Sequence, residues 1–186
     1  MGQFAYNKYS NNEFTGSDIT KKSIAVLPFI NDSPNEDNLY FCNGIMEGIL
    51  DHLSKIPELK VVSRTSVEQY RDNKPSLKKI AEELGVQYLV EGSVQRIGNQ
   101  VVIFAQLISA EDDVHLWSQK YNEDVTELFA VQANVTESIA DKLEMIISPK
   151  VKERIENIPT NNPLAYDFYL QGNEFKFKAN QNLLLG

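Results

Sequence analysis

Residues 87–109 read QYLVEGSVQRIGNQVVIFAQLIS, and this stretch decides the fold class of the chain. Apolar and small residues alternate with polar ones on both sides of Gly98-Asn99, at Val90, Gly92, Val94, Val101, Ile103, Ala105 and Leu107. A period of two is typical of strands, and the two residues Gly98-Asn99 between the two runs indicate a hairpin turn. Asn-Gly is the preferred order in two-residue turns and Gly-Asn is weaker, so the turn could contain an extra bulged residue. A third run, Val114–Tyr121, follows a turn at residues 110–113. The sequence therefore predicts a three-stranded antiparallel meander over residues 87–121.

Upstream of the meander, short apolar runs alternate with helical patterns. SIAVLPFI at residues 23–30 is typical of a strand buried on both faces. Pro28 predicts either that the pairing of this strand stops there or that the strand lies at an edge of the sheet. A helix is expected from about residue 38 to 56. It contains Gly44 and Gly48, each of which costs about 1 kcal/mol relative to Ala inside a helix, so close packing is expected at both. A second strand at 59–63 and helices from about 65 and 76 complete this half, and Gly85 is expected to end the last of these helices.

Downstream, a long helical pattern runs from about residue 125 to 157, with Ile146 on the apolar face expected to be buried, and is interrupted at Ser148-Pro149. A linker and a last helix, from Leu164 to about Ala179, follow. The order β-α-β-α-β-β-β-α predicts an α/β fold with a mixed sheet, helices packed on it and an antiparallel meander at its end, plus a C-terminal helix. We divide the chain into a tail (1–22), an α/β domain (23–157), a linker (158–163) and the truncated start of a helical repeat (164–186).

Composition narrows the function classes. The formal net charge of -8 argues against nucleic acid or an anionic membrane as the main partner, because phosphate binding depends on clustered Lys and Arg. Cys42 is the only cysteine, which excludes an internal disulfide and a cysteine-rich metal site. No run approaches the roughly 18 apolar residues of a membrane span, and the polar first twenty residues do not form a signal peptide. A single cysteine suits the cytoplasmic or the periplasmic face of a bacterial cell, so the compartment stays open.

Five blocks of sequence carry a family resemblance: SIAVLPF, FCNGIMEGILDHLSKIPELKVVSRTS, IAEELGVQYLVEGSV, AQLISAEDDVHLWSQKY and ELFAVQANVTESIA. In this order they resemble the TolB-like N-terminal domain found in many bacterial regulators and repeat proteins. NPLAYDFYLQG at 162–172 resembles the first helix of a tetratricopeptide array. Gly48, Val102 and Phe104 depart from the usual pattern. The resemblance implies an α/β fold and a role in protein–protein or regulatory assemblies, and it implies no catalytic residue.

Arg64-Thr65-Ser66 is the most site-like cluster, because it follows a strand and opens a helix, where anions and ligands bind in α/β sheets. On the alternative interpretation, Thr65 caps the helix in a capping box with Glu68, and Arg64 pairs locally with a carboxylate.

A second candidate is the polar side of the meander. Glu91 and Ser93 alternate with the apolar face of their strand, and Gln106 faces them from the next strand. These residues predict either a polar groove on the open face of the sheet or a hydrogen-bond network that holds the hairpin in register. Trp117 on the outer strand is either an exposed interface residue or is buried under the long helix.

Catalytic and cofactor motifs are missing from the sequence, which has no GK[ST] phosphate loop, no nucleophile elbow and no HExxH pattern. We therefore expect no enzymatic activity, no cofactor and no metal. The first hypothesis is a non-catalytic protein-interaction or regulatory module of a larger bacterial multidomain protein. The alternative is a domain that senses a small molecule or an anion near Arg64 and is coupled to an output domain.

The C-terminal helix predicts a further contact. One face carries apolar and small residues at helical spacing: Ala165, Phe168, Tyr169, Gly172 and Phe175. Such a face is typical of burial, and in a repeat array the next helix would cover it. The helix must otherwise fold back on its own domain, fray or pair with another copy. The sequence therefore predicts a homodimer through this helix.

Overall fold

The computed structural model describes residues 21–73 and 75–184. Its centre is a six-stranded mixed sheet made of β1 (Lys22–Val26), β2 (Ile30–Asn31), β3 (Leu59–Val61), β4 (Tyr88–Ile97), β5 (Gln100–Ser109) and β6 (Val114–Asp124). The strand order is β3-β1-β4-β5-β6, and β2 also pairs with β4. β1 is parallel to β3 and β4, whereas β4, β5 and β6 form the antiparallel meander. The expected α/β class and mixed sheet are confirmed.

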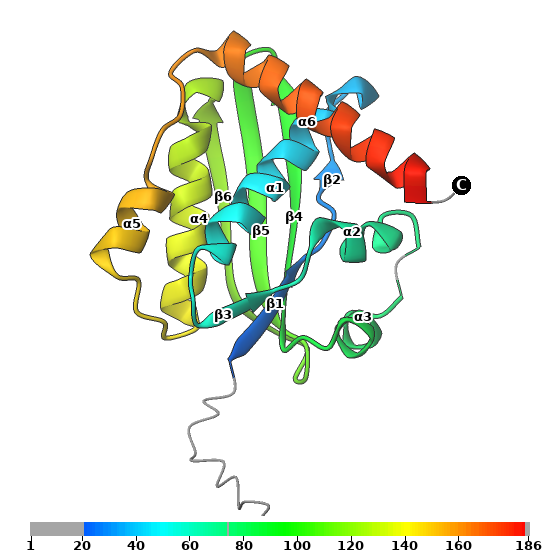
Figure 1. The fold of residues 1–186 in the computed structure, drawn as a ribbon, viewed down its shortest axis with the longest axis vertical. Helices are drawn as coiled ribbons and strands as arrows, with labels where there is room; N and C mark the ends of the chain where they lie inside the picture. Colours follow the sequence, from blue (N-terminus) through cyan, green and yellow to red (C-terminus); the bar gives the residue numbers. More distant parts are fainter. Residues whose placement is uncertain (1–20, 74, 185–186) are drawn as a thin grey trace, which may run out of the picture.

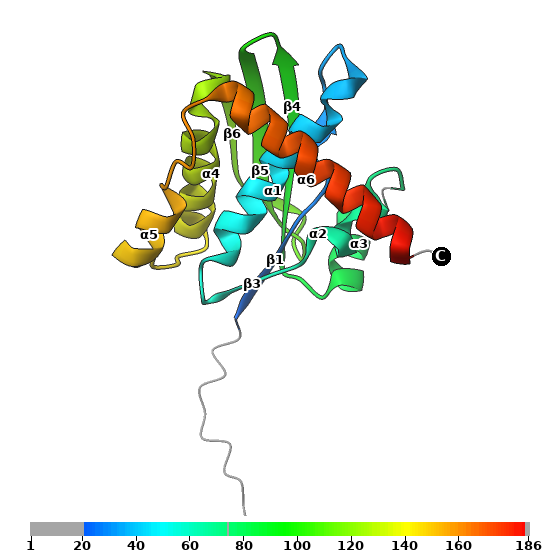
Figure 2. The same ribbon diagram turned by 45° about the horizontal axis from the view of Figure 1, so that its top comes forward.

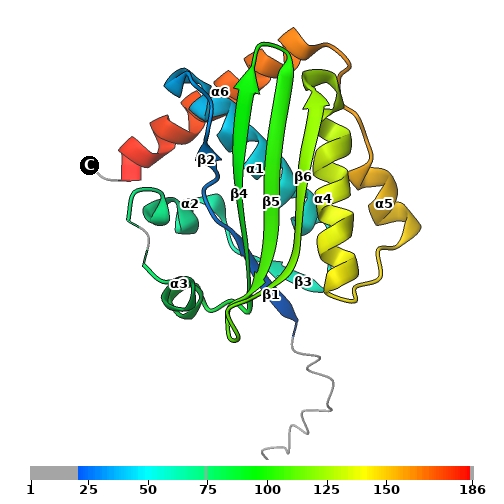
Figure 3. The same cartoon turned by 180° about the vertical axis from the view of Figure 1, so that it is seen from behind.

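The described residues form six α-helices: α1 (Leu39–Ser54), α2 (Arg64–Val67), α3 (Leu77–Leu84), α4 (Leu128–Lys142), α5 (Pro149–Ile155) and α6 (Pro163–Leu184). Figure 1 shows α1 and α4 side by side across one face of the sheet, with α6 crossing over α1. Seen from behind in Figure 3, most of the other face of β4, β5 and β6 carries no helix of the described residues, while α2 and α3 lie beside β1 and cover Leu89 at the start of β4. None of the described helices is long and apolar enough to cross a membrane.

The hairpin turn forms as predicted and without a bulge. Ile97 pairs with Gln100, so Gly98 and Asn99 are the only turn residues. Gly98 has φ of 59°, and a positive φ at the first of two turn residues is the geometry that favours glycine there. The one irregularity of the meander lies between Leu107 and Ile108, where the β5–β6 register shifts.

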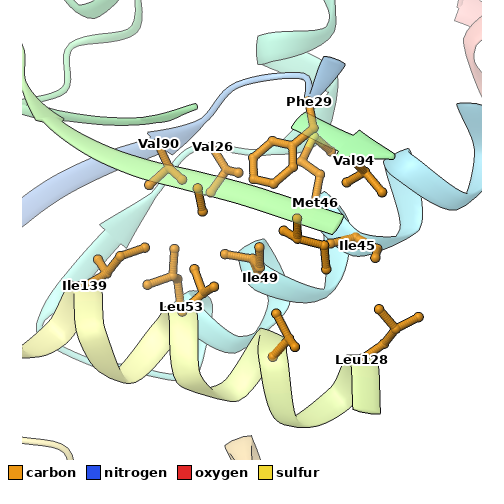
Figure 4. Close-up of a cluster of buried hydrophobic side chains, with 14 of the residues drawn as sticks. Val26, Phe29, Ile45, Met46, Ile49, Leu53, Val90, Val94, Leu128 and Ile139 are labelled. Carbon is orange, nitrogen blue, oxygen red and sulfur yellow. The ribbon is translucent and has the colours of Figure 1, made fainter. Parts of the chain in front are cut away.

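The first strand is buried on both faces because two cores meet across it. Ile24 and Val26 join the main core beneath α1 and α4, and Ala25 and Leu27 join a smaller core beneath α2 and α3. Figure 4 shows the main core as a continuous layer between β4, α1 and α4. Pro28 ends β1 as expected, and the chain pairs with β4 again only at β2. Burying large aliphatic side chains contributes roughly 1.5–3 kcal/mol each, so this layer dominates stability.

Helix ends follow local chemistry, with two corrections. Ser76 caps α3 and Gly85 ends it at φ of 63°, as the sequence predicts. The capping box at Thr65 is wrong: Ser63 occupies the N-cap of α2, so Arg64 and Thr65 lie inside the helix. Ile146, expected on the buried face of the long helix, is 89% exposed, because α4 ends at Lys142.

The C-terminal helix folds back on its own domain, but with a different face from the one expected. Tyr166 and Leu170 are buried and belong to the main core. Phe168, Tyr169 and Phe175, which the sequence placed on the face for burial, are 62%, 61% and 77% exposed. The 22-residue helix therefore has two apolar sides, one packed on the domain and one facing outward.

Candidate functional site

The candidate site is the junction where α6 crosses α1, and two glycines of α1 make this crossing close. Leu170 of α6 lies directly over Gly44, where a Cβ atom would collide with its methyl groups. Gln132 of α4 lies over Gly48 in the same way. The close packing expected at these glycines is confirmed, and it brings α4 and α6 down onto the same helix.

A buried ion-pair cluster fastens the middle of α6 to the domain. The guanidinium of Arg64, 6% exposed, donates from Nη2 to Glu174 of α6 at 2.7 Å and from Nη1 to Glu47 of α1 at 3.1 Å. The Cζ atom of Arg64 lies 3.7 Å from the ring centroid of Phe177. Asn43 donates to the same Glu174 oxygen at 3.1 Å. Arg64 therefore joins α1, α2 and α6 in one network.

A second ion pair fastens the start of α6. Arg96 at the end of β4 donates to Asp167 at 2.6 Å, and the Tyr40 hydroxyl donates to the same carboxylate at 2.8 Å. The Arg96 guanidinium also lies 4.3 Å from the ring centroid of Phe41. Because Asp167 and Glu174 are two helical turns apart, the two ion pairs hold one side of α6 against the domain.

The electrostatics of the junction keep both carboxylates charged. Burial by itself would raise the pKa of Glu174, but the hydrogen bond and positive charge of Arg64 outweigh burial, and the pKa lies below its ordinary value. The same balance, with Arg96 as the partner, lowers the pKa of Asp167. Both ion pairs are therefore present at neutral pH.

A cavity of about 580 Å³ lies beside this junction, between α1, α4, α6 and the linker after α5. Gln132, Tyr166 and His52 are buried in its wall, and Tyr169 contributes to its α6 side. The Nδ1 atom of His52 is buried without a hydrogen-bond partner, and burial lowers the pKa of this imidazole, so it is neutral at pH 7. Arg64 does not line this cavity.

The outward side of α6 is the largest run of exposed apolar side chains in the part of the chain that the structure describes. Leu164, Phe168, Tyr169, Phe175 and Leu183 are each more than 60% exposed. Figure 2 shows α6 lying across the surface of the domain, above α1. Single exposed apolar residues are ordinary, but a contiguous apolar strip on one helix is typical of an interaction surface.

The residues proposed from the sequence fall in three separate places. Arg64 is paired with carboxylates of the same chain, as the second of the two interpretations of this cluster predicts. Thr65 and Ser66 are exposed on α2. On the face of the sheet opposite α1 and α4, Gln106 donates to Glu91 at 3.0 Å in the cross-strand position that the sequence predicts.

The other two sequence candidates do not extend either cluster. Ser93 lies opposite Phe104, two residues along from Glu91. Trp117 is opposite Leu107 and packs, half-buried, against the main core, so it is neither a fully exposed nor a fully buried residue. The structure thus pairs Glu91 with Gln106, places Ser93 opposite Phe104 on the same two strands, and places Arg64 and Trp117 elsewhere.

Sequence reasoning missed the carboxylates of α6. Asp167 and Glu174 are the only acidic residues after Glu156, and a spacing of seven places both on one face of a helix. That pattern indicates a polar docking side opposite the aromatic one. In residues 21–73 and 75–184, no group of three or more His, Cys, Asp or Glu side chains could hold a metal ion.

One solved structure shares the architecture. The chain is similar to TolB from Acinetobacter baumannii, with 18% identity and a TM-score of 0.50 over 66% of this chain and 28% of TolB. The lipoprotein GNA1162 from Neisseria meningitidis is 19% identical, with a TM-score of 0.49 over 64% of this chain and 99% of GNA1162. At 18% identity, the likeness to TolB shows the fold alone.

Sequence comparison adds a relative and a family. A putative adenylate cyclase 3 from Rhizobium meliloti is 39% identical over 154 residues, which are 83% of this chain and 26% of the relative. The chain therefore spans about a quarter of the length of this curated relative. Residues 20–142 match the family described as the HilA/YgeH-like transcriptional regulator, second domain. Because this match covers most of the α/β domain, the chain belongs to the family of HilA/YgeH-like regulator second domains.

Proposed function

We propose that this chain is a non-catalytic regulatory domain that binds a protein partner through the outward side of α6. The observation that carries the proposal is the exposed apolar strip at Phe168, Tyr169 and Phe175, on a helix whose opposite side is fixed to the domain by two ion pairs. A pre-ordered helix loses little conformational entropy on binding, which favours recognition by a partner helix.

The two findings on relatives support a regulatory role. The matched family is described as a domain of transcriptional regulators, and the 39% identical relative is named as a putative adenylate cyclase. A shared domain in proteins with such different names is expected of a module that regulates or assembles, rather than one that performs the chemistry. The role as part of a larger bacterial signalling protein belongs to this proposal.

The resemblance of residues 162–172 to a tetratricopeptide helix also belongs to the proposal. In a helical repeat each helix packs between successive neighbours. One side of α6 is covered by α1 and the other side is open, as expected for the first helix of such an array.

Photocrosslinking tests the binding surface directly. Benzoylphenylalanine at position 168 should form an adduct with another protein molecule in the cells that produce this chain. The same group at Ile146, which lies outside α6 and is 89% exposed against 62% for Phe168, is the control and should form far fewer adducts. Adducts at both positions alike, or at neither, would contradict the proposed surface.

Catalysis is tested separately. The purified chain is incubated with ATP and Mg²⁺ or Mn²⁺, and cyclic AMP is measured. We expect no product above that of a heat-denatured sample, and turnover by this chain would remove the non-catalytic part of the proposal.

A second candidate function is ligand sensing in the cavity beside α6. The neutral, unpaired Nδ1 of His52 in a mixed aromatic and polar wall favours it. A ligand in this cavity would contact Tyr166 and Tyr169 and so influence the position of α6. Thermal stabilisation by a metabolite, lost in His52→Phe, would support sensing.

A further inference from the structure

On the outward side of α6, residues of the same kind lie three and seven positions before and after Gly172. Ala165 and Ala179 lie seven residues before and after Gly172, and Tyr169 and Phe175 lie three before and after. Phe168, four residues before, corresponds to Lys176, four residues after. Offsets of three, four and seven share one face of a helix, so all of these residues lie on the exposed side.

A two-fold axis through Gly172 would superpose this pattern on itself. In an isologous contact, the residue a given number of positions before the axis meets the residue the same number after it in the other copy. Here Ala165 would meet Ala179, and Tyr169 would meet Phe175. Small residues thus oppose small residues and aromatic rings oppose aromatic rings.

We propose that the partner of this face is a second copy of the same chain, bound through an antiparallel α6–α6 pair with its two-fold axis at Gly172. The inference rests on the proposed function, since it names the protein that binds the outward side of α6.

Gly172 itself points to close contact with another backbone. Glycine inside a helix costs about 1 kcal/mol relative to alanine. Among the helix-interior glycines that the structure describes, Gly44 is covered by Leu170 and Gly48 by Gln132, whereas a Cβ atom at Gly172 would find nothing within 4 Å. The domain therefore gives no reason for a glycine at this position. Close approach of a second helix does, because it leaves no space for a side chain at the crossing point.

The charges on α6 suit self-association of an otherwise acidic chain. The net charge is -8, yet both carboxylates of α6, Asp167 and Glu174, face their own domain and are paired with arginines. The outward side thus carries no acidic residue to repel its copy. In the two-fold register, Lys176 lies opposite Phe168, where an ammonium over an aromatic face is attractive. Antiparallel helices also oppose their macrodipoles favourably.

The available area corresponds to a weak dimer. Aromatic side chains bury about 150–250 Å² each when fully covered. Three of them per copy, about two-thirds exposed, supply roughly 600–1,000 Å² in two copies, to which the neighbouring alanines and Leu164 add. Specific interfaces begin at about 1,000 Å² in total, so we expect a dissociation constant on the order of 10 μM.

Sedimentation equilibrium of the 186-residue chain, over a range of about 1 μM to 1 mM, tests the pairing. The mass should rise from that of one chain to that of two. Gly172→Leu has open space in its own domain and raises helix propensity, so the monomer should remain folded, whereas dimerisation should weaken more than tenfold. Ile146→Lys, which changes an exposed apolar residue outside α6, should dimerise as the original chain does.

Disulfide trapping tests the register. Gly172→Cys places the two thiols at the two-fold axis and should give a covalent dimer on mild oxidation, while Cys42 is buried and does not compete. Leu164→Cys would lie opposite Asn180 of the other copy and should not. Equal trapping at positions 164 and 172 would overturn the two-fold axis at Gly172.

The outcomes separate this inference from the proposed function. If the chain stays monomeric to millimolar concentration while position 168 crosslinks to a different protein, the second copy is excluded and the protein-binding surface stands. Without adducts at position 168 and without dimerisation, both proposals fail. A dimer that is unaffected by Gly172→Leu overturns the α6–α6 contact.

Discussion

At the scale of single residues, Arg64 is the centre of the junction. It lies within 4 Å of carboxylates from three residues, Glu47, Glu68 and Glu174, and it is almost fully buried. A buried ion pair adds little net stability over an apolar core, because both charges are desolvated. Removing only one partner of the pair, however, lowers the unfolding free energy strongly, since the other buried charge is left without an opposite charge.

Arg64→Met should therefore destabilise the chain by roughly 3–5 kcal/mol, because Glu174 keeps its charge in a buried place. The measurement is the unfolding free energy from urea denaturation at pH 7. The control is Lys79→Met, which removes an exposed pair with Glu83 and should change stability by less than about 1 kcal/mol. Equal effects of the two substitutions would show that Arg64 contributes no more than a surface charge.

The pH dependence of stability follows from Glu174. Its pKa is lowered in the folded state, so its contribution is fully present above the ordinary value of 4.5 and is lost as pH falls through the lower folded pKa. Glu174→Gln should lower stability by about 1–3 kcal/mol at pH 7 and flatten the decline below pH 4.5. Unfolding free energies measured from about pH 6 to pH 3 check this. Parallel curves for the two proteins would contradict the assignment.

At the scale of elements, glycines with different roles mark the turn, the crossings and the exposed face. Gly98 supplies a positive φ, Gly44 supplies space for Leu170, and Gly172 does neither within its own domain. The same substitution should therefore act differently at each position.

Gly98→Ala should destabilise the hairpin by about 1 kcal/mol or more, because alanine tolerates a positive φ poorly. Gly172→Ala should stabilise the isolated chain by about 0.5–1 kcal/mol, because the added methyl meets no atom and helix propensity rises. Thermal unfolding at low protein concentration, where chains are monomeric, compares the two. We expect Gly98→Ala to lower the stability and Gly172→Ala to raise it. A change in the same direction for both substitutions would refute one of the two glycine roles.

At the scale of the whole molecule, α6 is held by packing at Gly44 and by two ion pairs, across a linker without regular structure. Of the buried residues in the main core, only Tyr166 and Leu170 belong to α6, so we expect α6 to detach without unfolding the sheet. Local opening of this kind is seen as hydrogen exchange faster than that of the core.

Gly44→Val should displace Leu170 and release α6. Amide hydrogen exchange in residues 163–184 is then expected to accelerate at least tenfold, while β4 and β5 remain protected. Gly172→Val places the same side chain in open space on the outer side of the helix and serves as the control. Accelerated exchange throughout the sheet would mean that α6 is an integral part of the domain core.

Much of the fold could be predicted because its signals are local. Gly98-Asn99 between two alternating runs specified the meander, and Ser76 and Gly85 specified the ends of α3. Residues that can cap a helix also show where prediction from sequence failed. Thr65 was assigned as the cap where Ser63 is, because both residues can cap and only the backbone distinguishes them.

The sequence by itself determined the strand order of the meander, the α/β class and the absence of familiar catalytic motifs, since each depends on neighbouring residues. Only the tertiary structure decided which side of α6 is buried. Both sides of this helix carry apolar residues at helical spacing, so periodicity could not choose between them. The choice depends on contacts more than sixty residues apart in sequence, between Asp167 and Arg96, Glu174 and Arg64, and Leu170 and Gly44, which a local pattern cannot register.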